Sequence, residues 1–198
     1  MNHYILRLLL IAGSIALWFL TQRLISRRLP QQQGIYDHLH YLTRHLNDYL
    51  FSHHRAANVL LVISSFFIDA LTLFVIALSI FGDSFTPFWG LLILFFLRQL
   101  SQMIVALPAP PQMIWRHPGV PSLFVTYGIG NDLFFSGHTA LAVYGACQLA
   151  TLQSPLLSAC GIAIALFEAV TVIVLRAHWS LDVLTGTFAA LCVALLIK

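Results

Sequence analysis

Charged residues are scarce in this chain. Only 9% of its 198 residues are Asp, Glu, Lys or Arg, whereas 59% are hydrophobic. A soluble domain usually carries about 25% charged residues. So many apolar side chains cannot be hidden inside an aqueous fold, so we expect the solvent to be lipid. The basic residues are scattered along the chain and form no stripe, which excludes nucleic acid as an expected partner.

Cysteine is also rare. Cys147, Cys160 and Cys192 all fall inside apolar runs, where they are expected to act as small buried side chains. A disulfide framework is therefore excluded. The sequence predicts no metal site and no cofactor.

Long hydrophobic runs, in contrast, are abundant. A helix needs about 20 mostly apolar residues to cross the hydrocarbon core. Six stretches qualify, approximately 4–24, 57–81, 85–107, 133–153, 156–175 and 179–197. The first is expected to be retained, because no small-residue cleavage site follows it. The predicted fold is all-α: an integral, multi-pass membrane bundle of six transmembrane helices forming a single domain over residues 1–198.

Residues 35–51 have a different, amphipathic pattern. Ile35, Leu39, Leu42, Leu46 and Tyr49 share one face at helical spacing. This predicts a helix that lies in the plane of the membrane interface. A spacer packed against the bundle is the favoured interpretation, and a direct role in substrate binding is the alternative.

Loop lengths indicate where a site should lie. The connection between the third and fourth stretches, LPAPPQMIWRHPGVPSLFVTYGIGND, is rich in proline and glycine and cannot be a regular helix. The second and third stretches, and the fourth and fifth, are joined by only a few residues. All substantial loops therefore belong to one membrane face, where long structured loops are often functional.

Two motifs at that face carry candidate chemistry. In SGHT, Ser136 and Thr139 are helix-capping residues, and Gly137 allows the backbone to approach a ligand. A helix that begins near His138 would offer free amides to a phosphate, and His138 could donate a proton there.

The second motif is RAHWSLDVLTG. His178 and Asp182 are four residues apart and so share a helical face, on which a carboxylate can orient an imidazole. His178 would then act as nucleophile or base. Either histidine alone is more often simply a polar residue at a water boundary; together the motifs favour catalysis.

Further polar and aromatic residues accompany the motifs. Asp69, Arg98 and Glu168 fall inside predicted spans. Unpaired charges there are costly, so these three either form a buried ion-pair cluster or serve the site, Arg98 through phosphate and Glu168 through a histidine. Aromatic side chains near the motifs could contact a quaternary ammonium headgroup, although interfacial anchoring is the more common role. They are Trp115, Tyr127 and Trp179.

Three segments resemble the sphingomyelin synthase branch of the type 2 phosphatidic acid phosphatase superfamily. They are LPAP at 107–110, GNDLFFSGHT at 130–139 and HWSLDV at 178–183. The last two also resemble plant phosphatidylcholine:diacylglycerol cholinephosphotransferases. The resemblance covers about residues 95–190 and implies a lipid enzyme in which membrane lipids are both substrate and acceptor.

The resemblance also implies a mechanism. His178, oriented by Asp182, would attack phosphorus and form a phosphohistidine. His138 would protonate the departing lipid alcohol and then activate the acceptor. An alcohol acceptor gives a transferase, and water gives a phospholipase C-like hydrolase. Asp132 falls on the aspartate of the synthase motif and is expected near the headgroup.

The sequence also departs from the lipid phosphate phosphatases. The lysine- and arginine-rich motif of those enzymes is absent, and Val172 stands where they carry an arginine, although Arg176 could replace it in part. This favours a phosphodiester of a glycerophospholipid or sphingolipid over a phosphomonoester. A lipid phosphate phosphatase is the alternative, and a haem-binding electron carrier with His138 and His178 as axial ligands is a remote one.

Sidedness and oligomeric state remain open, a homo-oligomer included. Arginines gather on the loop-bearing face, which by the positive-inside rule belongs in the cytoplasm. The resembling enzymes act on the opposite, lumenal or periplasmic side.

Overall fold

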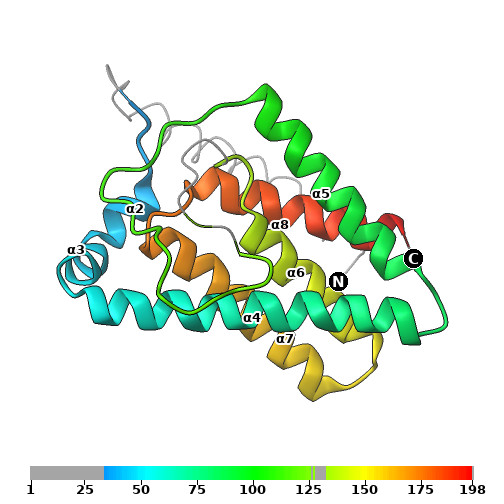
Figure 1. The fold of residues 1–198 in the computed structure, drawn as a ribbon. Helices are drawn as coiled ribbons and strands as arrows, with labels where there is room; N and C mark the ends of the chain where they lie inside the picture. The colour runs from blue at the N-terminus through cyan, green and yellow to red at the C-terminus, as the bar shows by residue number, and fades with distance from the viewer. Residues whose placement is uncertain (1–33, 126, 128–132, 198) are drawn as a thin grey trace, which may run out of the picture. The chain divides into compact units, whose positions relative to one another are not determined.

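The computed structural model describes residues 34–125, 127 and 133–197. Backbone contacts divide the chain into two compact units, Met1–Tyr36 and Asp37–Lys198. The described secondary structure lies in the second unit and is entirely helical, as predicted (Figure 1). Its elements are α2 (His38–Leu42), α3 (Arg44–Ser52), α4 (His54–Phe81), α5 (Thr86–Ile104), α6 (Gly137–Thr151), α7 (Pro155–Val174) and α8 (Ser180–Leu196). A single domain over residues 1–198 stays a prediction.

Three of the described helices, α4, α5 and α7, are long and apolar enough to cross a membrane. Six spans are therefore not supported. The stretch predicted at 4–24 lies outside the described residues. The stretches predicted at 133–153 and 179–197 form α6 and α8, which have only 15 and 17 residues. They are shorter than predicted because residues 133–136 and 179 are non-helical segments that lead into the caps.

The predicted interfacial helix is broken at Thr43 into α2 and α3. The Thr43 amide and hydroxyl both donate to the Leu39 carbonyl, which closes the first helix after two turns at most. All five predicted apolar residues, Ile35 included, are exposed, and His40, Asn47 and Leu50 face the protein instead. Those within α2 and α3 are Leu39, Leu42, Leu46 and Tyr49. An apolar outer face is consistent with an element that contacts lipid. Ile35, the fifth residue, lies in the first unit.

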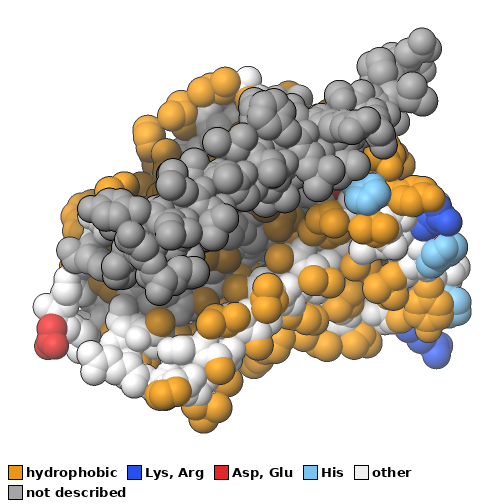
Figure 2. All heavy atoms as spheres, turned by 180° about the vertical axis from the view of Figure 1, so that it is seen from behind, with side chains coloured by type: hydrophobic (Ala, Val, Ile, Leu, Met, Phe, Trp, Pro, Cys, Tyr) orange, Lys and Arg blue, Asp and Glu red, His pale blue; other side chains and the backbone are white. Residues whose placement is uncertain are grey.

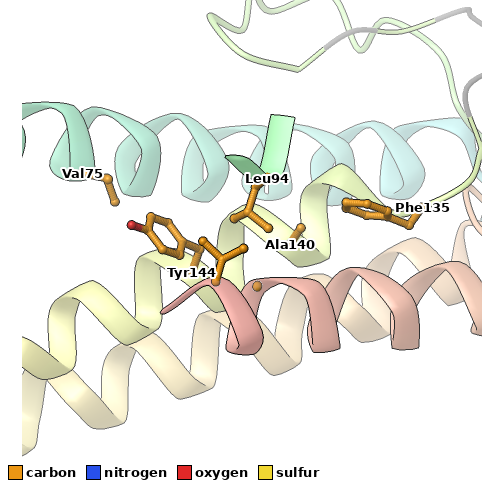
Figure 3. Packing of buried hydrophobic residues seen from close by; sticks show 7 residues of the cluster. Val75, Leu94, Phe135, Ala140 and Tyr144 are labelled. Carbon is orange, nitrogen blue, oxygen red and sulfur yellow. The ribbon is translucent and has the colours of Figure 1, made fainter. Parts of the chain in front are cut away.

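Helix α6 occupies the centre of the second unit, with α4, α5, α7 and α8 all packed against it (Figure 1). Figure 3 shows Tyr144 and Ala140 of α6 among Val75, Leu94 and Phe135. Tyr144 is fully buried and donates from its hydroxyl to the Pro87 carbonyl at 2.9 Å. This core holds the start of α6, which carries the SGHT motif, in a fixed position.

The surface of the described part is strongly apolar. Figure 2 shows hydrophobic side chains spread over the helices, with basic side chains and histidines gathered at one end. Exposed basic and imidazole side chains of α3 and the start of α4 are Arg44, His45, His53, His54 and Arg55. Apolar sides with polar ends are typical of a protein that lies in a bilayer.

The Pro-rich loop is attached to the middle of α4 through Asp69. The Asp69 carboxylate accepts hydrogen bonds from the Ser122 hydroxyl at 3.0 Å, the Leu123 amide at 2.9 Å and the Phe124 amide at 3.0 Å. Non-helical backbone at membrane depth requires protein partners for its polar groups. Asp69 supplies them, so it stabilises the loop and does not contribute to the predicted ion-pair cluster.

Candidate active site

The SGHT motif begins α6 as predicted. Ser136 is the N-cap, and its hydroxyl accepts from the Thr139 amide at 3.3 Å and lies 3.0 Å from the Thr139 hydroxyl. The Ala140 amide donates to the Ser136 carbonyl. Ser136 and Thr139 are both fully buried and engaged with each other. Their side chains therefore form the helix cap, while the amides of Gly137 and His138 remain at the positive end of the helix.

The segment that carries His178 follows a sharp end of α7. The Arg176 amide donates to the Ile173 carbonyl and the Ala177 amide to the Val172 carbonyl, which is the hydrogen-bond pattern of a Schellman motif. Arg176 occupies the left-handed position, with φ 53°, that glycine usually takes. Its side chain donates to the Pro111 carbonyl at 3.1 Å and the His40 carbonyl at 3.4 Å. Arg176 thus holds loops together and does not line the cavity described below.

The ring of His178 is held in one tautomer. Its Nδ1 lies 2.8 Å from the Leu133 carbonyl, which can only accept, so Nδ1 carries the proton and donates. Nε2 is left with a lone pair and has no hydrogen-bond partner among the described residues. Only 6% of His178 is exposed. An imidazole in this state is a nucleophile with a defined direction of attack.

Asp182 lies beside His178, but it is not the nearest partner of the ring. Its Oδ2 is 3.7 Å from His178 Nδ1 and accepts from the Trp179 amide at 2.9 Å. Asp182 is fully buried, and its Oδ1 has no hydrogen-bond partner within the described part of the chain. The carboxylate therefore caps α8 and supplies a negative charge close to the ring. The Leu133 carbonyl, which is the nearer partner, determines the tautomer of His178.

Close contact between α6 and α8 brings the two motifs together. The Ser136 amide donates to the Asp182 carbonyl at 3.1 Å. Gly186 of α8 lies so near that a Cβ there would be 2.6 Å from the Ser136 carbonyl oxygen. The absence of a side chain at Gly186 therefore permits the approach of the two helix starts.

His138 and His178 line one cavity of about 410 Å³, within the size range of small-molecule sites. His138 Nε2 is buried and has no hydrogen-bond partner among the residues that the structure describes, and the ring packs edge-on against Trp115, with centroids 4.9 Å apart. Packing, rather than hydrogen bonding, holds this second imidazole.

Arg98 brings a positive charge to the same cavity. A Cβ on Gly137 would be 2.9 Å from Arg98 Nε, so the guanidinium lies directly against the start of α6. Arg98 Nε also donates to the Phe135 carbonyl at 3.3 Å. Gln99 and Gln102, on the same helix, line the cavity as well, and sequence reasoning did not single them out.

Several predicted residues do not line this cavity, although Trp115 does. Glu168 is fully buried in α7 and accepts from the Ser64 hydroxyl at 2.6 Å, so neither it nor Asp69 pairs with Arg98. The Tyr127 hydroxyl contacts that of Ser65, and burial raises the pKa of Tyr127. Trp179 donates to the Pro108 carbonyl at 2.9 Å. The Asp132 prediction lies outside the described residues.

Sequence reasoning missed Asp37 and His40, which contact the segment from His178 to Ser180. His40 is 4% exposed, and its Nε2 lies 3.0 Å from the His178 carbonyl. The only available signal was that these polar residues fall opposite the apolar face of the 35–51 pattern. If the apolar face of residues 35–51 contacts lipid, the opposite, polar face must contact the protein, and only then does the position of Asp37 and His40 indicate a protein contact.

The helices and the cavity together define a helical membrane protein with two imidazoles on one internal site. The family described as AtPDCT1/2, the phosphatidylcholine:diacylglycerol cholinephosphotransferases, matches residues 36–198, and the chain belongs to this family. It is therefore a phospholipid-modifying membrane enzyme. No curated protein and no solved structure gives a significant match.

Proposed function

We propose that this protein transfers a phosphocholine headgroup from one lipid to the hydroxyl of a diacylglycerol-type acceptor, through a phosphohistidine at His178. Family membership supports headgroup transfer. The observation that carries the two-step mechanism is that His138 and His178 line one cavity while the Leu133 carbonyl keeps the proton of His178 on Nδ1.

In the first step, His178 Nε2 attacks phosphorus and forms a P–N bond. The P–O bond to the glycerol oxygen breaks, and His138, in its protonated form, gives its proton to that oxygen. In the second step, neutral His138 takes the proton of the acceptor hydroxyl, whose oxygen attacks phosphorus while the P–N bond breaks. The proton returns to His138, so the cycle closes without net acid or base.

The start of α6 is the proposed position for the phosphate. The Gly137 and His138 amides lie at the positive end of the helix, and the Arg98 guanidinium packs against Gly137. A helix N-terminus and a guanidinium both stabilise a phosphate oxyanion. His138 and Gly137 line the cavity, which would bring the phosphorus between the two imidazoles.

Monoester hydrolysis is the alternative, and one observation weighs against it. Arg176, the candidate replacement for the missing phosphatase arginine, donates to loop carbonyls and does not line the cavity. A monoester dianion would then have Arg98 as its arginine partner in the described part of the cavity, whereas a diester carries one negative charge and needs fewer cations. Placement in the wider phosphatidic acid phosphatase superfamily stays a prediction.

The two histidine roles can be separated with p-nitrophenyl phosphocholine, whose leaving group needs no proton. Purified protein in lipid nanodiscs would be incubated with this compound, with and without diacylglycerol. We expect His138→Gln to release one equivalent of nitrophenolate and accumulate an acid-labile phosphocholine adduct. We expect His178→Gln to release none. Turnover in both variants should fall about 10⁴-fold.

Two results would contradict the proposal. An adduct in His178→Gln would assign the nucleophile to another residue. Release of phosphate from phosphatidate, with no transfer from phosphatidylcholine, would assign the protein to the phosphatases. His45→Gln, on the exposed surface of α3, is the control for loss of an imidazole and should behave as wild type.

A further inference from the structure

Asp37 binds the start of two helices at once. Its Oδ1 accepts from the Leu39 amide at 3.0 Å and the His40 amide at 3.2 Å, which caps α2. Oδ1 also accepts from the Ser180 hydroxyl at 2.6 Å, and Oδ2 accepts from the Ser180 amide at 2.6 Å. Ser180 is the first residue of α8. One carboxylate therefore ties α2 to the helix that follows His178.

His40 contacts the two residues that precede Ser180. Its Nε2 donates to the His178 carbonyl at 3.0 Å, and its ring stacks on Trp179 with centroids 5.2 Å apart. His40 is buried, and none of the described residues makes a hydrogen bond to its Nδ1, so the ring is neutral with its proton on Nε2. Residues 178, 179 and 180 thus each receive a contact from Asp37 or His40.

From this arrangement we infer that Asp37 and His40 are positioning residues for His178, and that α2 belongs to the catalytic machinery without touching the substrate. The inference rests on the proposed nucleophilic role of His178. The Leu133 carbonyl orients the ring of His178 from one side, and His40 fixes the backbone that bears the ring from the other. Together these contacts set the direction in which Nε2 points.

The partners of Asp37 support a role in positioning His178. A contact that only capped α2 would require no donors beyond the Leu39 and His40 amides. Asp37 instead places both oxygens on Ser180, 143 residues away in the chain. A displacement of about 1 Å at a reacting atom can cost about 100-fold in rate. The contacts of Asp37 and His40 next to the nucleophile are therefore expected to act on kcat.

The first test replaces His40 with Leu and with Gln and measures transfer kinetics in nanodiscs. His40→Leu keeps the volume but loses the donor, and kcat should fall about 100-fold with KM within about twofold of wild type. His40→Gln places an amide N–H near the former Nε2 and should recover most of that loss. His45→Leu, an exposed position on α3, is the matched control and should leave kcat unchanged.

The second test replaces Asp37 with Asn. Whichever way the amide is turned, its NH₂ group faces at least one N–H donor that the carboxylate accepted. We expect a loss of kcat in the same range, about 10- to 100-fold, with KM again preserved. Asp48→Asn, which removes an exposed carboxylate from α3, is the control and should match wild type. If His40→Leu does not fold, Asp37→Asn with this control carries the test.

A spectroscopic measurement keeps the inference separate from the proposed function. Ring ¹⁵N signals of His178, assigned by their loss in His178→Gln, should show one tautomer with the proton on Nδ1 in the wild type. In His40→Leu they should broaden or show both tautomers. An inactive wild type would overturn the proposed function, and the spectra would still decide the positioning role. Unchanged kcat and unchanged His178 signals in both His40→Leu and Asp37→Asn would overturn the inference.

Discussion

The two candidate catalytic histidines are held in opposite ways. His178 has hydrogen bonds on its ring and on its backbone carbonyl, from the Leu133 and His40 sides respectively. His138 packs against Trp115, and its buried Nε2 has no hydrogen-bond partner in the described ranges. A nucleophile must keep one tautomer through the cycle, which hydrogen bonds enforce. An acid–base group must exchange its proton, so packing can orient the ring without fixing the proton on one nitrogen.

Among changes outside the two histidines themselves, the largest expected effect comes from one that disturbs both of them together. Gly186→Ala would place a Cβ 2.6 Å from the Ser136 carbonyl oxygen, so α6 and α8 would have to separate. We expect transfer to fall about 100-fold and unfolding to become easier by about 1–3 kcal/mol. Steady-state kinetics and thermal unfolding in nanodiscs measure both.

The control for this change is Thr185→Ala, one residue earlier, where the hydroxyl donates only to the Leu181 carbonyl within the same helix. It should retain nearly full activity. If Gly186→Ala were as active as Thr185→Ala, close approach of the two helix starts would not be needed for catalysis.

A smaller effect is expected when the packing around His138 is altered. Trp115→Leu removes the edge contact with His138 and leaves every hydrogen bond of His178 in place. We expect overall transfer to fall about 10-fold, since general acid–base catalysis contributes about 10²–10⁴-fold in total. In the nitrophenyl assay the first release of nitrophenolate should keep its wild-type rate, and discharge of the adduct should slow.

Trp89→Leu, at an exposed position on α5, is the matched control. A slower first release in Trp115→Leu would mean that Trp115 also supports the nucleophile, and the contrast between the two histidines would be wrong.

The smallest expected effect is a loss of stability on acidification. It comes from the contacts of His40 and Asp37 with the segment that bears His178, and His138 plays no part in it. Burial lowers the pKa of His40 below its ordinary value of 6.5, and Arg176 adds to this, while the charges of Asp37 and Asp182 and the bond to His178 oppose it. The unfolded chain therefore binds a proton at His40 before the folded chain does. The contribution of His40 to the free energy of unfolding is fully present above pH 6.5. It is lost as the pH falls through the pKa that His40 has in the folded protein.

Asp37 acts in the same direction at lower pH. Burial raises the pKa of Asp37, but the hydrogen bonds from Ser180 and His40, with the attraction that a protonated His40 adds at low pH, lower it below 3.8. Of these two groups, only His40 should change the stability between pH 7 and pH 5. The melting temperature of the wild type should therefore fall more over this range than that of His40→Gln. Equal losses in the two proteins would contradict a neutral, buried His40.

The helical class and the start of α6 were predictable because both depend on local patterns. Apolar run length predicts helices, and Ser and Thr around a glycine predict a cap, which Ser136 forms. The number of spans was not predictable in this way. Run length counts apolar residues in non-helical approach segments, such as Leu133 and Phe135, as part of a helix.

The roles of the buried charged residues could not be predicted from the sequence either. Helical spacing correctly places Asp182 beside His178, but it cannot show that the Trp179 amide and the Leu133 carbonyl are the nearer partners. Asp69 was expected at a depth where it could meet Arg98, and it binds the loop at Ser122 instead. Hydrogen-bond competition between segments far apart in the chain leaves no local signature.

Composition and motif order were thus sufficient to indicate a lipid-embedded helical enzyme with His138 and His178 as candidates, because hydrophobicity and spacing are properties of the chain itself. Folding was needed to show which groups hold those imidazoles. The contacts of Asp37 and His40 with residues 178–180 join positions about 140 residues apart, as the separation of 143 between Asp37 and Ser180 shows. Such contacts exist only once α2 packs against the end of α7.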